Sequence, residues 1–139
     1  MTQRSEFLNA LIGSPWDWRT RNCWDFAVHV ELKLFGRKLP AVSVPAEMSK
    51  RWVLEAIETN PERALWRESE PSSEPSIVTA PDGALVLMAH LRMPAHIGVW
   101  LKPEQRVIHC SEQHGVCFET ALALRQMGWR NLKFFEPNA

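Results

Sequence analysis

The apolar residues in the first half of the chain recur every three or four positions, which is the spacing of amphipathic helices. This spacing predicts three helices, over residues 5–12, 23–35 and 46–59. Asn60 followed by Pro61 is an N-cap with proline at the first helical position, so a short turn of helix should follow through Trp66. Residues 68–76 are charged and rich in serine and proline, and we expect a surface loop there.

The second half of the chain changes to short apolar runs that are separated by turn-forming residues. These runs predict a helix over residues 121–127 and β-strands over residues 84–89, 96–101, 106–110, 115–118 and 131–135. Helices that precede a mostly antiparallel sheet make an α+β arrangement. The 139 residues are enough for one core, so we expect a single domain over residues 1–139.

Two histidines lie in neighbouring predicted strands, and their spacing puts them on one face of the sheet. If residues 102–105 form the loop of a hairpin, the pairing register places Gly98 opposite His109. His96 and His109 are then diagonal neighbours about 7–8 Å apart, and Gly98 leaves room for an imidazole ring. A register slip of one residue would instead put the two histidines on opposite faces.

Cys23 begins the second predicted helix, directly after Asn22, which is a good N-cap residue. The positive end of the helix dipole and the unpaired N–H groups there favour a thiolate over a thiol. We therefore expect Cys23 to be a nucleophile, with His96 as its general base and His109 as the residue that orients His96. The alternative is that Cys23 is a buried structural cysteine, His96 a histidine at a sheet edge, and His109 a core histidine.

The other two cysteines are expected to pack rather than to react. Strand alternation sends Cys110 to the face opposite His109, and Cys117 does not begin a helix. Together with His114 they offer only three zinc ligands, without the paired spacing of zinc sites, so we expect no metal and no other cofactor.

The composition narrows the classes of partner. Hydrophobic residues make up 45% of the chain, which is typical of a globular protein, and 16 basic residues balance 16 acidic residues. The zero net charge does not favour binding to nucleic acid or to an anionic membrane. No apolar run is long enough for a signal peptide or a membrane span, and the odd number of cysteines predicts reduced thiols. We therefore expect cytoplasmic synthesis, with release by lysis or inside a particle.

The chain has seven tryptophans and no tyrosine. Trp16, Trp18 and Trp24 cluster around Cys23 in the sequence, and they either line a pocket or belong to the core. Because large aromatic side chains dominate protein cores, we expect at least half of the tryptophans to be core residues.

The order of these motifs resembles the NlpC-type papain-like cysteine peptidases, which cut peptidoglycan stem peptides, and it is most similar to their phage-tail subgroup. The matching motifs are Gly13-Ser-Pro-Trp16, Asn22-Cys-Trp-Asp-Phe-Ala-Val28, Phe35-Gly-Arg-Lys-Leu-Pro40, Ala80-Pro-Asp-Gly-Ala-Leu-Val-Leu87, His96-Ile-Gly-Val-Trp100 and Ile108-His-Cys110. The resemblance covers most of the chain outside residues 47–76. It implies a papain-like (NlpC-type) fold, with N-terminal helices packed on a mostly antiparallel sheet of five to six strands.

The resemblance also implies roles for individual residues. By it, Cys23 is the nucleophile, whose backbone N–H helps to form an oxyanion hole, His96 is the base and His109 is the third member of the triad. The residues that it implies for substrate binding are Trp16, Asn22 and Trp24. The family has tyrosine at the first of these positions and aspartate at the second. A neutral asparagine cannot pair with an ammonium group of a substrate as a carboxylate would.

Three functions are compatible with these motifs. The first is a cysteine peptidase or amidase that hydrolyses peptidoglycan stem peptides and is associated with phage tail proteins or a prophage. The second is a structural tail or interaction protein that keeps the fold without catalysis. The third is an amidase or acyltransferase of this fold that acts on a substrate other than peptidoglycan, such as a toxin or a lipid. A complete set of Cys23, His96 and His109 favours the enzymes, because a structural protein need not keep it.

Overall fold

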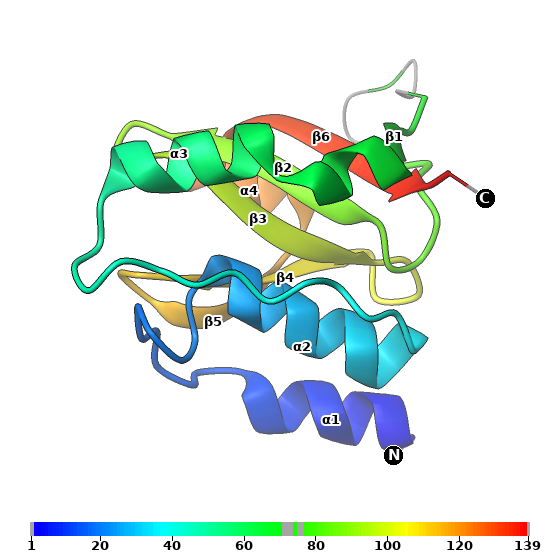
Figure 1. Cartoon of the computed structure of the whole chain (residues 1–139). Helices are drawn as coiled ribbons and strands as arrows, with labels where there is room; N and C mark the ends of the chain where they lie inside the picture. The colour runs from blue at the N-terminus through cyan, green and yellow to red at the C-terminus, as the bar shows by residue number, and fades with distance from the viewer. Residues whose placement is uncertain (1, 71–73, 75–76, 139) are drawn as a thin grey trace.

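The computed structural model describes residues 2–70, 74 and 77–138. Within this part of the chain, six strands form one sheet in the order β1-β6-β2-β3-β4-β5, and all neighbours are antiparallel. The strands are β1 (Trp66–Glu68), β2 (Leu85–His90), β3 (Met93–Leu101), β4 (Arg106–Ser111), β5 (Gly115–Glu119) and β6 (Arg130–Pro137). The prediction of an α+β fold with a mostly antiparallel sheet of five to six strands is confirmed (Figure 1).

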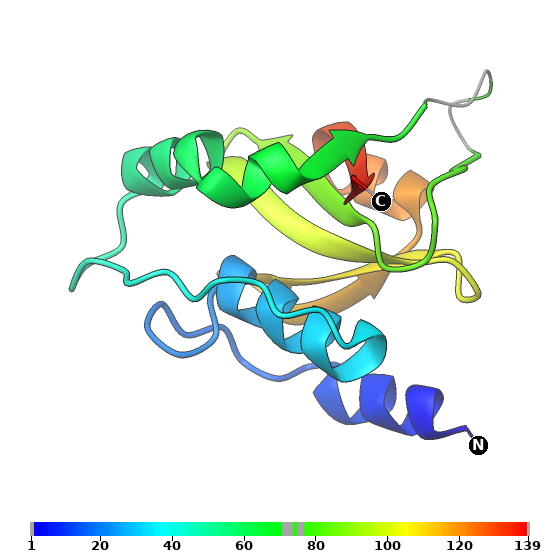
Figure 2. The same cartoon turned by 45° about the vertical axis from the view of Figure 1, so that its right-hand side comes forward.

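The helices lie on both sides of this sheet. They are α1 (Gln3–Leu11), α2 (Cys23–Phe35), α3 (Lys50–Thr59), the 3-10 helix η1 (Pro61–Leu65) and α4 (Ala121–Gln126). In Figures 1 and 2, α1 and α2 lie side by side on one side of the sheet, and α4 lies on the other. Helix α3 packs against β3, and a long connection that crosses in front of α2 leads to it.

Side-chain caps decide where the helices begin. Asn22 Oδ1 accepts a hydrogen bond from the N–H of Asp25 at 2.8 Å, which starts α2 at Cys23 as predicted. Helix α3 begins at Lys50, and the prediction that it begins at residue 46 is wrong. The hydroxyl of Ser49 accepts from the N–H of Trp52 at 3.2 Å and so caps the helix later in the chain.

Two hydrophobic cores lie on opposite faces of the sheet, and strand alternation assigns residues to them. On β3, Ile97, Val99 and Leu101 belong to the core beneath α1 and α2. Trp100 belongs to the second core, together with Leu124 of α4. His96 pairs with Met88 and has the parity of Trp100, so it lies on the second face, whereas Cys23 belongs to the core beneath α1 and α2 and meets His96 only along the cavity that both line.

Two features of the sheet differ from the sequence analysis. Strand β1 was expected to be the end of a helical turn and the start of a loop, but Trp66, Arg67 and Glu68 pair with β6. A strand of three residues is too short to show the alternation of apolar and polar residues, so β1 can be recognised only from its pairing with β6. The expected loop at residues 68–76 lies partly outside the described residues. Strand β3 begins at Met93 instead of residue 96, and the added part contains Pro94, a residue that is disfavoured inside strands.

Candidate active site

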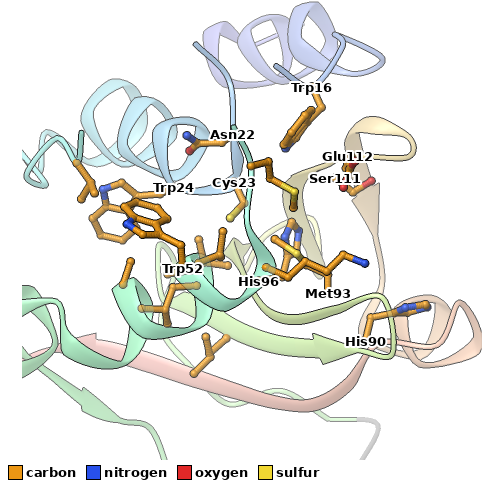
Figure 3. Close-up of a pocket in the computed structure, with 18 of the residues that line it drawn as sticks. Trp16, Asn22, Cys23, Trp24, Trp52, His90, Met93, His96, Ser111 and Glu112 are labelled. Carbon is orange, nitrogen blue, oxygen red and sulfur yellow. The ribbon is translucent and has the colours of Figure 1, made fainter. Parts of the chain in front are cut away.

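Cys23 lines a cavity that opens between the start of α2, helix α3, and strands β2 and β3. Its side chain is 6% exposed. Figure 3 shows this side chain extending from the helix start toward the strand that carries His96. The backbone N–H of Ile97, which follows His96, interacts with the thiol, and His96 lines the same cavity. The predicted nucleophile and the predicted base are thus brought to one cavity from two separate elements.

The N–H groups at the helix start favour the thiolate of Cys23 as expected, but burial outweighs them. Burial raises the pKa of the Cys23 thiol to about 11 from its ordinary value of 9.0. The backbone N–H groups of Ile97, Trp24 and Cys23 itself lower this pKa, but each of them does so by less than burial raises it. At neutral pH the group is a thiol, so a base must take its proton during any reaction.

The two histidines meet through their rings. His96 Nε2 and His109 Nδ1 lie 2.9 Å apart, which confirms the predicted hydrogen-bond contact. The last paired residues of β3 and β4 next to them are Val99 and Ile108, so the histidines lie just beyond the ladder and connect the two strands by their side chains. The register and the loop of residues 102–105 are also as predicted.

Gly98 permits this approach. A Cβ atom at Gly98 would lie 2.8 Å from Val107 Cγ1 and 3.0 Å from His109 Cβ. Both distances are at or below the closest that Cβ atoms show, so a side chain at this position would push β4 and His109 away. The expected role of Gly98 as space for the imidazole is confirmed.

The contact constrains the tautomers of the pair. Because Nε2 of His96 bonds to His109, only Nδ1 of His96 could act as a base toward another group. For Nδ1 to accept a proton, Nε2 must carry one and donate it to His109 Nδ1. His109 then carries its own proton on Nε2, which is buried and has no hydrogen-bond partner in the described part of the chain.

Both histidines are neutral at rest. Burial lowers the pKa of His96 well below its ordinary value of 6.5, and the neighbouring His109 lowers it further. Burial, with a smaller effect of His114, lowers the pKa of His109 to about 4. The resting site is therefore a neutral thiol beside two neutral imidazoles, and not an ion pair.

Trp129 is a part of the site that sequence analysis missed. Its ring stacks on His96 with centroids 4.6 Å apart and an angle of 21° between the planes, and it meets the edge of His109 at 5.7 Å. His90 contacts the same indole at 5.2 Å. Trp129 directly precedes β6, which pairs with β2 and not with the histidine strands, so no spacing along the chain indicates this contact.

The cavity has a volume of about 680 Å³, within the range of roughly 300–1,000 Å³ that is typical of ligand pockets. The tryptophans that line it are Trp16, Trp18, Trp24, Trp52, Trp66 and Trp129. Only Trp100 and Trp129 fall in the buried class among the seven. Trp16, Trp24 and Trp66 are partly buried and pack against the core beneath α1 and α2, so five of the seven tryptophans take part in a core as expected, and the tryptophan-lined pocket is present as well. Apart from Trp129, the tryptophans that line the cavity are half-buried at the opening between α2 and α3.

The three residues expected to bind substrate all line this cavity. Asn22, however, has both side-chain groups engaged, because Oδ1 caps α2 and Nδ2 donates to the carbonyl of Trp18 at 2.9 Å. Trp16 stacks on Trp18 with centroids 6.3 Å apart. Trp24 donates its ring N–H to the carbonyl of Pro40 at 2.8 Å. Asn22 thus shapes the wall, and the two tryptophans offer ring surface.

Cys110 and Cys117 lie away from the histidine pair. Cys110 is fully buried in the core beneath α2, on the opposite face from His109 as predicted, and its thiol donates to the carbonyl of Arg21 at 3.4 Å. Cys117 is partly exposed, and its thiol points to the carbonyl of Gly115 at 3.5 Å. All three cysteines are free thiols. In the described part of the chain, no group of three or more metal-ligating side chains is placed to hold a metal ion.

Comparison of the sequence with protein-family models and with curated proteins gave no match. Among the described residues, no helix has the length and apolar character that a membrane crossing requires.

Proposed function

We propose that this protein is a cysteine amidase with a papain-like, NlpC-type fold, in which Cys23 is the nucleophile, His96 the general base and His109 the positioning residue. The observation that carries the proposal is the 2.9 Å contact between the rings of His96 and His109 beside the cavity that Cys23 lines. A cysteine at a helix start and a base oriented by a third group are the parts that nucleophilic catalysis requires.

The reaction begins from the neutral site. Cys23 Sγ attacks the carbonyl carbon of the scissile amide while His96 Nδ1 takes the thiol proton. The backbone N–H of Cys23 donates to the oxyanion that develops. Proton transfer and attack occur together, because the raised pKa of the thiol and the lowered pKa of the imidazole disfavour a separate ion pair.

The second half of the reaction returns the proton. The imidazolium of His96 is stabilised by the face of Trp129 and by His109 Nδ1, which accepts from Nε2–H. His96 donates its Nδ1 proton to the leaving amine, and the acyl group remains on Cys23 as a thioester. A water molecule deprotonated by His96 then hydrolyses the thioester and restores the thiol.

The resemblance names peptidoglycan stem peptides as the first substrates to test and phage tail proteins as partners. Purified protein is incubated with peptidoglycan, and the soluble fragments are identified by mass spectrometry. We expect release by the wild type and none by Cys23→Ala. Cys110→Ser is the matched control, since it also removes a buried thiol from the same core, and it should keep most of the release. Release that is equal in Cys23→Ala would contradict the proposal.

A further inference from the structure

The cavity is apolar on one side of Cys23. Figure 3 shows Trp24 and Trp52 on this side, and Ser111 and Glu112 on the opposite side of the thiol. Apolar residues of α2, α3, β2 and the connection before α3 line it, including Trp24, Val44, Trp52, Val53, Ile57 and Leu87. The scissile bond at Cys23 would therefore have an apolar group on one side and a polar group on the other.

Several polar groups on the walls of this cavity are engaged within the protein. The indole N–H groups of Trp18 and Trp24 donate to backbone carbonyls at 2.7 and 2.8 Å. Asn60 Oδ1 accepts from the N–H of Glu62 at 2.9 Å, and Glu62 Oε1 accepts from the Trp66 indole at 3.1 Å. A sugar or a charged peptide placed there would lose water without gaining hydrogen bonds from these groups.

The cationic residues that border the cavity do not make its apolar side polar. Lys50, Arg63 and Arg92 are all exposed, so they lie at the rim. Arg63 also covers the ring of Phe135 at 5.9 Å.

We propose that this side of the cavity binds a linear hydrocarbon chain, so that the group transferred to Cys23 is a medium- or long-chain acyl group. The choice of substrate class rests on the proposed amidase function, whereas the binding of the chain does not. A methylene group needs about 30 Å³, similar to a water molecule in the liquid, so a chain of about ten carbons fills less than half of the 680 Å³.

The reaction with an N-acyl amide balances with water alone. Cys23 Sγ forms a thioester with the acyl carbon, the C–N bond breaks, and His96 passes the thiol proton to the leaving amine. Water then breaks the thioester, which gives a fatty acid and the free thiol.

The test uses N-acyl glycinamides with chains of four to ten carbons, because their uncharged head group does not respond to the rim cations. Binding to the Cys23→Ala protein is measured by titration calorimetry, which separates affinity from turnover. Each methylene that enters an apolar site is worth a factor of up to about four in affinity, so Kd should fall by roughly two- to fourfold per carbon. Affinity that does not depend on chain length would overturn the proposal.

Filling the cavity gives a second measurement. Ala56 lines the cavity from α3, whereas Ala46 is exposed and lies outside it, so Ala56→Trp and Ala46→Trp form a matched pair. Ala56→Trp should weaken binding of the decanoyl compound at least tenfold and the butanoyl compound much less, and Ala46→Trp should weaken neither. The chain-length series uses the unfilled cavity, so the conclusion does not depend on the folding of Ala56→Trp.

Turnover by the wild type distinguishes the two proposals. Chain-length-dependent binding without cleavage of any amide supports the acyl site and contradicts the amidase. Cleavage of stem peptides without binding of acyl glycinamides supports the amidase and overturns the acyl site. Cleavage with a KM that falls along the series supports both.

Discussion

At the scale of single residues, the chemistry of Cys23 depends on two opposing effects. The helix start and its N–H groups lower the pKa of the thiol, and burial raises it. Burial is the larger effect because desolvation acts on the whole charge of the thiolate, whereas each N–H group compensates only part of it. The site does not store a thiolate, so the mechanism that we propose assigns the removal of the thiol proton to His96.

This balance predicts the pH dependence of alkylation. In the double variant Cys110→Ser with Cys117→Ser, Cys23 is the remaining thiol, and its reaction with iodoacetamide should accelerate about tenfold per pH unit from pH 7 to 9. The reason is that the thiolate fraction of a group with a pKa of about 11 is still rising there. The rate is followed by mass spectrometry, and a plateau of the rate below pH 8 would contradict the raised pKa.

The double variant Cys110→Ser with Cys117→Ser should also keep most of the activity of the wild type, because neither removed thiol lies at the histidine pair.

Asn22 gives a second prediction at this scale. Asn22→Asp keeps the cap on α2 but replaces the Nδ2 donor with an oxygen that faces the carbonyl of Trp18. We expect the free energy of unfolding to fall by about 1–3 kcal/mol at pH 7, measured by urea denaturation. The loss should shrink near pH 4, where a protonated aspartate can again donate. The resemblance predicts that the same change improves turnover of stem peptides with a free amino end, so stability and activity are measured together.

Asn22→Ser is the control for Asn22→Asp. It keeps an N-cap oxygen and introduces no charge, so its loss of stability should not depend on pH between 7 and 4. An equal pH dependence in both variants would show that repulsion between the aspartate and the carbonyl of Trp18 does not cause the loss of stability in Asn22→Asp.

At the scale of elements, the approach of β3 to β4 holds the histidine pair. Gly98→Ala should lower the free energy of unfolding by about 1–3 kcal/mol, because the added methyl group would lie 2.8 Å from Val107 Cγ1. It should also break the contact between His96 and His109, which is visible in the imidazole nitrogen resonances by NMR.

Gly36→Ala, at the C-cap of α2, is the control for Gly98→Ala. Its Cβ would have no atom within 4 Å, but its φ of 67° is left-handed, so it should cost about 1–2 kcal/mol through the backbone alone. The histidine resonances of Gly36→Ala should remain those of the wild type. If both variants change the histidine resonances equally, the change in Gly98→Ala comes from a general loss of stability and not from the displacement of β4.

At the scale of the whole molecule, two buried groups couple stability to pH with opposite signs. Burial lowers the pKa of His109 from 6.5 to about 4, so its contribution is complete above pH 6.5 and is lost as the pH falls to about 4. Burial raises the pKa of Glu31 from 4.5 to about 7, against the opposing effect of Arg37. Its contribution is complete below pH 4.5 and is lost as the pH rises to about 7. Each shift corresponds to about 3 kcal/mol.

Glu31→Gln tests this opposition. Removing the carboxyl group should leave the histidines unopposed, so the variant should lose about 3 kcal/mol more than the wild type when the pH falls from 6.5 to 4.5. His109→Asn should show the opposite change of slope. Urea denaturation at several pH values measures both, and parallel curves for all three proteins would contradict the assignment.

The sequence by itself was sufficient where a feature depends on neighbours along the chain. The cap of Asn22 on α2 acts within three residues, and the register that joins His96 to His109 follows from a four-residue loop and the two-residue period of strands. These local rules predicted the α+β class, five of the six strands and the histidine contact.

The tertiary structure alone decided what depends on distant segments. Strand β1 exists because β6 pairs with it, and Trp129, which directly precedes β6, stacks on His96 across the intervening strand β2. The ionisation of Cys23 also belongs here, because the amount of water removed from the thiol is set by α3, β3 and the walls of the cavity together. Local sequence patterns predict backbone geometry, whereas the burial of a side chain depends on every element that packs around it. The pKa values at this site depend on burial.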